Sequence, residues 1–181
     1  MRKIIVGEFI SLDGVVDAPD RWHFPYVNEE MFAAMWSHMA QVDTMLLGRV
    51  TYDSYAGAFG NAPADDQVAA QMNRPAKVVV SRTLTELAWE NSRLLTGDVA
   101  EEVTRLKQQP GAGILTTGSI ALVRTLLRAG LVDELSLLVH PIVVGTGRRL
   151  FEEPGPRVPL ELVECKTLST GVIHQRYRIP G

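Results

Sequence analysis

The sequence predicts an α/β fold with a mostly parallel β-sheet and an antiparallel edge. Strand-like apolar segments alternate with amphipathic segments along most of the chain, which is the pattern of β-α-β units. Two further strand-like segments, residues 160–168 and 172–179, flank the turn at 169–171, and this arrangement predicts a closing hairpin. The chain has 181 residues with no internal repeat or long linker, so we expect residues 1–181 to form one domain.

The first half of the chain is expected to contain three strands and three helices. Residues 3–11 are largely apolar, so they predict a central strand covered on both faces. A helix follows Asn28, a good N-cap residue, with Glu29 and Glu30 in its first turn. Its predicted inner face consists of Phe32, Met35, Trp36 and Met39. The other expected elements are a strand at 43–47, a helix that opens at residue 48, a short helix at 65–73 and a strand at 76–80.

The second half centres on a strand at 114–116, a sharp turn at 117–119 and the helix that follows. Ser119 is the predicted N-cap of that helix, and Gly130 is placed where a glycine commonly ends a helix. A weaker strand near 88–93 and a helix at 99–108 precede this unit, and a strand at 135–144 follows it. In the second arm of the hairpin, Ile173 and Tyr177 are expected on one face, opposite His174 and Arg176.

Composition excludes several classes of function. Charged residues are 22% and the net charge is −3, which gives no reason to expect binding to nucleic acid or to a membrane surface. The one cysteine, Cys165, rules out an internal disulfide framework, and the four histidines lack metal-ligand spacing, so we expect no metal. Glu8 and Asp13 interrupt the first apolar run, which favours a strand over a signal peptide and predicts a cytoplasmic protein.

Three predicted strand ends carry similar chemistry. Each is followed by glycine, hydroxyl or arginine residues: Gly48, Arg49 and Thr51; Ser81 and Arg82; and Thr117, Gly118, Ser119 and Ile120. The carboxyl ends of parallel strands line the ligand crevice, and these residue types suit phosphate groups, as does a helix N-terminus. The set predicts a dinucleotide, and an arginine directly after a strand favours NADP over NAD. Alternatively, the glycines only form tight turns and the arginines are solvated.

These segments also resemble known reductases. Gly-Arg-x-Thr at 48–51 and the strand ending in Ser-Arg at 78–82 are similar to dihydrofolate reductases. Ser-Leu-Asp-Gly at 11–14, together with segments 131–135 and 141–147, resembles the reductase domain of riboflavin-biosynthesis deaminase-reductases. The order matches from Ser11 to Phe151, so the chain is identified as a member of the stand-alone deaminase-reductase C-terminal-domain family. The zinc motifs of the deaminase half are absent.

The resemblance implies a dihydrofolate-reductase-like three-layer fold, NADPH as cofactor and a homodimer. By position, Gly48, Arg49 and Thr51 would meet the phosphates, and Ser81 and Arg82 would hold the 2′-phosphate. The turn at Thr117 and Gly118, with Ser119 and Ile120, would cover the pyrophosphate. Dihydrofolate reductases have Gly-Gly where this chain has Thr117-Gly118. They also carry a pterin-facing carboxylate on the first helix, whereas this chain has Glu29 and Glu30 in the first turn and an apolar inner face. The loop at 11–16 would lie beside the nicotinamide.

Proton transfer and substrate binding are assigned to an aspartate and to aromatic residues. Asp13 lies at the end of the first strand and is the candidate proton donor, although Asp-Gly is also a common turn dipeptide. Trp22 and Tyr26, in an aromatic loop, and Phe32 are candidate walls for a flat substrate ring. Alternatively, these rings only pack against the helix and the core.

The expected function is an NADPH-dependent reductase that transfers hydride to a flat nitrogen heterocycle, either pterin-like or a ribosylamino-pyrimidine. One alternative is a non-catalytic NADP(H)-binding dimeric module or sensor. Another is an enzyme on the same scaffold that reduces nitro or quinone compounds.

Overall fold

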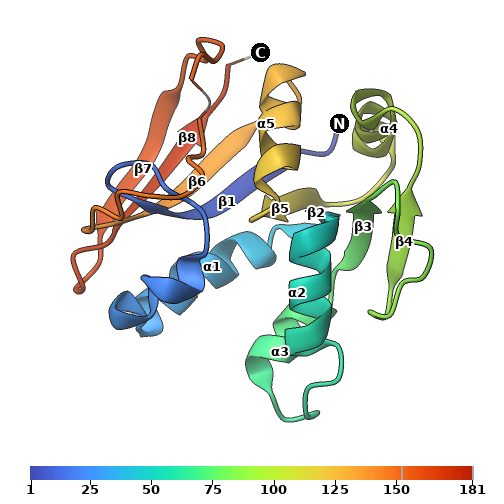
Figure 1. Ribbon diagram of the computed structural model, residues 1–181, viewed down its shortest axis with the longest axis horizontal. Helices are drawn as coiled ribbons and strands as arrows, with labels where there is room; N and C mark the ends of the chain where they lie inside the picture. The colour runs from blue at the N-terminus through green and yellow to red at the C-terminus, as the bar shows by residue number, and fades with distance from the viewer. Residues whose placement is uncertain (152, 181) are drawn as a thin grey trace.

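The computed structural model describes residues 1–151 and 153–180, and one eight-stranded sheet runs through it (Figure 1). The strand order is β4-β3-β2-β5-β1-β6-β8-β7. Among these strands only β8 runs antiparallel to its neighbours. The strands are β1 (Ile4–Ser11), β2 (Val42–Gly48), β3 (Ala76–Val80), β4 (Ser92–Leu95), β5 (Gly113–Thr117), β6 (Glu134–His140), β7 (Glu161–Thr167) and β8 (Ile173–Arg178). The predicted α/β class with an antiparallel hairpin edge is therefore confirmed.

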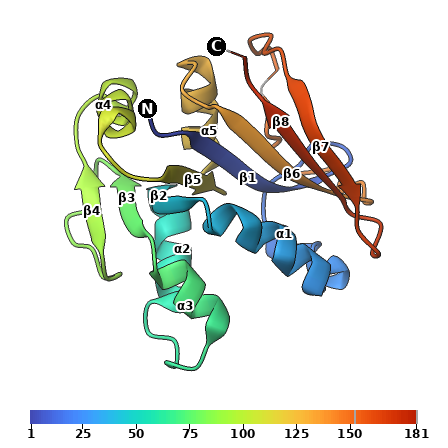
Figure 2. The same ribbon diagram turned by 180° about the vertical axis from the view of Figure 1, so that it is seen from behind.

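Helices cover both faces of the sheet and complete three layers, as Figures 1 and 2 show from opposite sides. On one face lie α1 (Glu29–Met39), α2 (Arg49–Phe59) and α3 (Gln67–Asn73). On the other lie α4 (Val99–Gln108) and α5 (Ile120–Arg128). Two short 3-10 helices, η1 (Pro19–Arg21) and η2 (Phe24–Tyr26), lie in the connection between β1 and α1.

Strand β1 lies near the middle of the sheet because its side chains are apolar on both faces. Ile4, Val6 and Ile10 belong to the core formed with α4 and α5. Ile5 packs into the core beneath α1, α2 and α3, and Phe9 contacts a smaller cluster beneath α1. A strand with this pattern needs cover on both sides, which the three layers provide.

Local capping signals set several helix ends. The Asn28 side chain accepts a hydrogen bond from Met31 N at 3.0 Å, as its position predicted. At the end of α5, Gly130 has a φ of 65°, and Leu131 N donates to Leu126 O at 3.0 Å. This pair of features is a Schellman ending, in which glycine adopts a left-handed conformation that other residues avoid.

Asp133 links β1 and β8, the first and last strands along the sequence. Its N–H donates to Ile4 O at 3.0 Å, and its carbonyl accepts from Ile179 N at 2.9 Å. Its carboxylate accepts from Ile4 N at 2.7 Å and from the ammonium of Lys107, on α4, at 2.6 Å. One residue therefore connects the start of β1 and the end of β8 to α4.

Two strand predictions need correction. β4 begins at Ser92 rather than near residue 88, because the buried Trp89 is held in a loop by hydrogen bonds to Tyr52 and Asn73. β6 ends at His140 rather than at residue 144. Ile142 N turns back to His140 O at 2.8 Å, so residues 141–144 leave the sheet.

Two predicted faces also differ in the structure. On α1 the buried side chains are Met31, His38 and Met39, while Phe32 and Trp36 stack on each other, only partly buried, with centroids 6.1 Å apart. In β8, His174 is buried although it was grouped with charged side chains. The His38 ring lies against it with centroids 5.4 Å apart, because α1 covers this face of the hairpin.

The buried Tyr52 hydroxyl supplies a test of this packing. It accepts a hydrogen bond from Trp89 N at 2.8 Å, so Tyr52→Phe leaves that N–H unpaired in the core. We expect the free energy of unfolding to fall by about 1–3 kcal/mol in urea denaturation. Tyr177→Phe is the control, because the Tyr177 hydroxyl is only partly buried. Equal losses of unfolding free energy in the two variants would contradict a stabilising hydrogen bond between Tyr52 and Trp89.

Candidate functional site

The three strand ends singled out in the sequence meet at one edge of the sheet. Gly48 pairs with Val80 in the parallel register, so Arg49 and Ser81 leave the sheet side by side. The end of β5 is joined to the same place by Ser119. Its hydroxyl accepts from Gly48 N at 2.9 Å, and its N–H donates to Thr51 Oγ1 at 2.8 Å.

Ser119 does not cap α5 in the predicted way. It occupies the N-cap position but has a φ of 43°, and its side chain makes no hydrogen bond to the helix. Its hydroxyl instead serves Gly48. The first N–H groups of a helix have no partner inside the helix, so those of α5 remain suited to an anion at this edge.

The turn before α5 requires glycine for a structural reason as well. Gly118 has a φ of 57°, and a Cβ atom at this position would lie 2.9 Å from Thr51 Oγ1. Thr117 turns its side chain toward α2, where its hydroxyl is hydrogen-bonded to Tyr55. The Ile120 side chain is buried in the core, so only its backbone can face a ligand.

The arginines at this edge are exposed donors. Arg49 donates to Thr83 Oγ1 at 2.7 Å and lies 3.4 Å from Asp53. The Ser81 hydroxyl accepts from Thr83 N at 3.2 Å and from Leu84 N at 3.0 Å. Arg82 is exposed and makes no hydrogen bond or ion pair with any residue that the structure describes. Two guanidinium groups, hydroxyls and a helix N-terminus form a donor set that fits the phosphates of NADPH.

Asp13 is placed as a structural carboxylate. It accepts hydrogen bonds from the Ser11 hydroxyl at 2.7 Å, Val144 N at 3.0 Å and Gly145 N at 2.9 Å. These bonds, that from Ser11 above all, lower the pKa of Asp13 to about 2. A carboxyl group ionised at neutral pH has no proton to give, so the geometry argues against the predicted donor role.

The aromatic loop packs around a histidine. His140 is fully buried, and the rings of Trp22 and Tyr26 meet it edge-on with centroids at 5.1 Å and 5.4 Å. Trp22 also donates its indole N–H to Asp17 O at 3.0 Å. Trp22, Tyr26 and Phe32 do not line the pocket described next, so their predicted role as walls of a substrate ring has no support in that pocket.

A pocket of about 80 Å³ lies between the sheet and α1, α2 and α3. Much of its wall is apolar, with Met35, Trp36, Met39, Met45 and Met72 among the lining residues. The polar lining residues are Glu8, His38, Tyr55, Thr117 and Ser136. Thr117 is also the last residue of β5, so the pocket adjoins the strand-end edge.

Glu8 is a site residue that the sequence reasoning missed. The residue is 6% exposed, and its Oε1 atom has no hydrogen-bond partner. Burial raises the pKa of Glu8 well above its usual value, although Gly118 N donates to the carboxyl group and opposes the shift. Strand alternation places the side chain on the face of Val6 and Ile10. The available signal was a carboxylate inside an otherwise apolar central strand.

Comparisons with known proteins cover nearly the whole chain. Residues 2–174 match the family model described as the RibD C-terminal domain. Two curated proteins of Bacillus subtilis (strain 168), both named as uncharacterized, are similar to it. YyaP is 30% identical over 185 residues, covering 99% of this chain and 96% of the relative. YwjB is 26% identical over 176 residues, covering 94% and 95%.

Solved structures share the fold. A putative riboflavin biosynthesis protein from Shewanella sp. PV-4 has a TM-score of 0.76 at 20% identity, covering 99% of both chains. A pyrimidine reductase-like protein from Corynebacterium diphtheriae has a TM-score of 0.70 at 14% identity, covering 99% of this chain and 92% of the other. The Thermotoga maritima diaminohydroxyphosphoribosylaminopyrimidine deaminase/5-amino-6-(5-phosphoribosylamino)uracil reductase has a TM-score of 0.69 at 13% identity. The match covers 99% of this chain and 57% of the other. The dihydrofolate-reductase-like fold expected from the sequence is thereby confirmed.

Residues 1–151 and 153–180 contain neither a cluster of metal-ligating side chains nor a membrane-spanning helix. No group of three or more His, Cys, Asp or Glu residues in this part of the chain could hold a metal ion. No helix there is long and apolar enough to span a bilayer.

The buried Glu8 makes stability depend on pH. The folded protein keeps this proton, whereas the unfolded chain loses it near the ordinary glutamate pKa of 4.5, so stability falls as the pH rises from there toward the folded-state pKa. The fall is at most about 1.4 kcal/mol per pH unit. Glu8→Gln should abolish it in urea denaturation series, while Glu86→Gln, at an exposed position, should not. Parallel pH profiles for Glu8→Gln and the wild type would refute this.

The turn at Gly118 allows a matched pair of substitutions. Gly118→Ala combines a positive φ with a clash against Thr51, whereas Gly130→Ala has a φ of 65° and open space around the new Cβ. We expect Gly130→Ala to cost about 1 kcal/mol and Gly118→Ala distinctly more, measured by thermal and urea unfolding. Similar losses would show that the clash is relieved at little cost.

Proposed function

Because the chain belongs to the RibD C-terminal domain family, we propose that it is an NADPH-dependent reductase that transfers hydride to a flat nitrogen heterocycle. The family and the reductase-type fold are established by its sequence and structure. The observation that carries the proposal is the meeting of a phosphate-suited strand-end edge and an apolar pocket at Thr117.

The cofactor would lie along the strand-end edge. Arg82 and Ser81 would hold the 2′-phosphate, because Arg82 carries an exposed guanidinium group without a partner among the described residues. The pyrophosphate would meet the first N–H groups of α5 and the turn at Gly118. Arg49 and the segment from Gly48 to Thr51 would contact the remaining phosphate oxygens. Bound NADPH would supply the hydride, and these residues would hold and orient it.

The substrate would enter the pocket beneath α1. Trp36 and the methionine side chains offer a flat ring an adaptable apolar surface. They would also exclude water from the reacting carbon, which favours hydride transfer over side reactions. A pterin-like ring and a ribosylamino-pyrimidine both fit this description, and the name of the Thermotoga relative supports the second.

A non-catalytic NADP(H)-binding module is the second candidate. It is favoured by the ionised state of Asp13, which leaves the reaction without the proton donor expected from the sequence. In either case we propose a homodimer. Its interface would use β7, which is exposed along its whole length and carries the apolar side chains of Leu162 and Val163.

Turnover separates the two candidates. NADPH oxidation is followed by absorbance with dihydrofolate and with 5-amino-6-(5-phosphoribosylamino)uracil as substrates. Oxidation that depends on either compound supports the reductase. Tight NADPH binding with no oxidation by either compound would support the module, and the absence of NADPH binding at tens of micromolar would refute both.

Arg82→Ala tests the cofactor assignment. We expect NADPH affinity to fall about 10–100-fold, the equivalent of one or two charge-assisted hydrogen bonds, with NADH affinity little changed. Isothermal titration calorimetry measures both. Arg93→Ala, which removes another exposed arginine, is the matched control and should leave both affinities unchanged. Equal losses for NADPH and NADH in Arg82→Ala would remove Arg82 from the 2′-phosphate site.

A further inference from the structure

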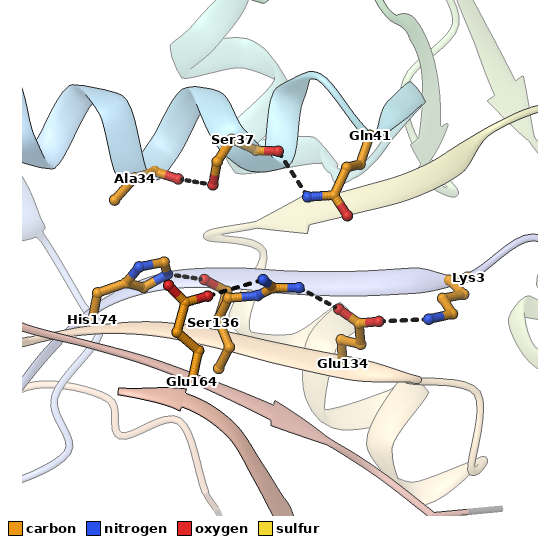
Figure 3. Close-up of polar contacts among 9 residues, drawn as sticks. Lys3, Ala34, Ser37, Gln41, Glu134, Ser136, Glu164 and His174 are labelled. Carbon is orange, nitrogen blue, oxygen red and sulfur yellow. Dashed lines mark hydrogen bonds and ion pairs between the residues drawn. The ribbon is translucent and has the colours of Figure 1, made fainter. Parts of the chain in front are cut away.

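Two histidines and a serine form a buried polar cluster beneath α1. Ser136 on β6 and His174 on β8 are hydrogen-bonded, with Oγ and Nε2 2.9 Å apart (Figure 3). The His38 ring from α1 stands perpendicular to the His174 ring, with centroids 5.4 Å apart. All three side chains are buried, with exposed fractions of 4–5%. His38 and Ser136 line the pocket.

The Nε2 atom of His38 lacks a hydrogen-bond partner. It is buried and makes no hydrogen bond to the described residues. A buried polar atom left unpaired costs about 1–3 kcal/mol, and such an atom calls for an explanation in a native structure. Because His38 lines the pocket, a ligand bound there could complete the missing hydrogen bond.

No lysine, arginine or aspartate among the described residues lines the pocket. Its one acidic lining residue, Glu8, leaves β1 on the opposite face of the sheet, and burial raises its pKa. Burial, together with the nearby His174, lowers the pKa of His38 to about 4, so this ring is neutral at neutral pH. A phosphate or carboxylate moved into this pocket would lose its hydration without gaining a cation, which is costly.

The charged groups around the cluster largely neutralise one another outside the pocket. Arg176 pairs with Glu134 at 3.3 Å and with Glu164 at 3.1 Å. Glu134 also pairs with Lys3 at 2.8 Å, and Figure 3 shows these two side chains along the sheet from Ser136. Lys166 and Glu164 act on the pKa of His174 in opposite directions. No lysine or arginine among them lines the pocket.

We propose that this pocket selects the uncharged ring of the substrate and that His38 and Ser136 hold the polar edge of that ring. The inference rests on the proposed function, which places the substrate in this pocket. Charged parts of a substrate, such as a phosphate or a glutamate tail, would remain outside. His38 and Ser136 are thus specificity-determining residues that use neutral hydrogen bonds.

The hydrogen-bonding groups of Ser136 and His38 suit an amide-like ring edge. If Ser136 donates to His174, its oxygen can accept from a ring N–H. If His174 donates, the serine hydroxyl can donate to a ring carbonyl. The neutral His38 can likewise act as donor or acceptor at Nε2. Adjacent N–H and C=O groups, as in pyrimidine and pterin rings, match this choice of partners.

The test compares two probes that differ by one carboxylate. Pterin is uncharged at neutral pH, whereas pterin-6-carboxylate is an anion. Calorimetric titration of the cofactor-free protein should show pterin binding at least ten-fold more tightly, with quenching of tryptophan fluorescence that is lost in Trp36→Phe. Equal affinities for the two probes, or no pterin binding, would overturn the proposal.

Substitutions test whether His38 and Ser136 are responsible for the selection of the uncharged ring. Ser136→Ala and His38→Gln should each weaken pterin binding about ten-fold without changing NADPH affinity. His38→Phe, which fills the site without a polar atom, should do the same. Ser37→Ala is the matched control on α1, because the Ser37 hydroxyl is exposed and donates to Ala34 O of the same helix, and this variant should bind pterin normally. Unchanged pterin affinity in both Ser136→Ala and His38→Gln would refute the assignment.

The two proposals fail separately. Loss of selectivity for the uncharged probe with intact NADPH binding would refute the present inference alone. Selective pterin binding that depends on His38, in a protein that does not bind NADPH, would refute the proposed reductase and leave the ring selection standing.

Discussion

The arrangement of the candidate site depends on two hydrogen bonds made by one residue. Ser119 joins the end of β5 to the junction of β2 and α2 through Gly48 N and Thr51 Oγ1. The parallel pairing of β3, β2 and β5 brings their ends to one edge, and this connection fixes the turn after β5 against the start of α2 there. The same contact sets the path of the turn, since Thr51 leaves no room for a side chain on Gly118. Structural and ligand-binding demands on these residues therefore coincide, and their residue types alone could not separate the two.

Burial decides which acids and bases near the site carry charge. Asp13 lies beside hydrogen-bond donors that lower its pKa, whereas Glu8 lies in the core, where burial raises its pKa. The two carboxyl groups are close in sequence, yet their pKa values shift in opposite directions, because hydrogen bonding stabilises the anion and desolvation opposes it. The Asp13 carboxylate accepts hydrogen bonds from Val144 N and Gly145 N and so fixes the loop that contains them. The buried His38, whose pKa is lowered to about 4, lines the pocket.

Local signals predicted much of the fold and part of the site. Residues 99–108 and 76–80 form α4 and β3 with the predicted bounds, and Asn28 and Gly130 act at helix ends as expected. The meeting of three strand ends also followed from the predicted parallel sheet, although ligand binding there stays a prediction. The pocket did not follow, because its lining comes from seven elements distant in sequence. His38 and Ser136 carry no local pattern, and only tertiary packing brings them together.

The position of Asp133 has a consequence for the connectivity of the chain. It holds Ile4 and Ile179 through backbone hydrogen bonds, so the first and last strands end close together. Because β8 is reversed, this meeting point lies at the edge of the sheet opposite the carboxyl ends of β2, β3 and β5. A short linker could therefore join the residues next to Ile4 and Ile179, and a circular permutant opened elsewhere would keep the candidate ligand edge intact. The topology separates the meeting point at Asp133 from the candidate ligand edge.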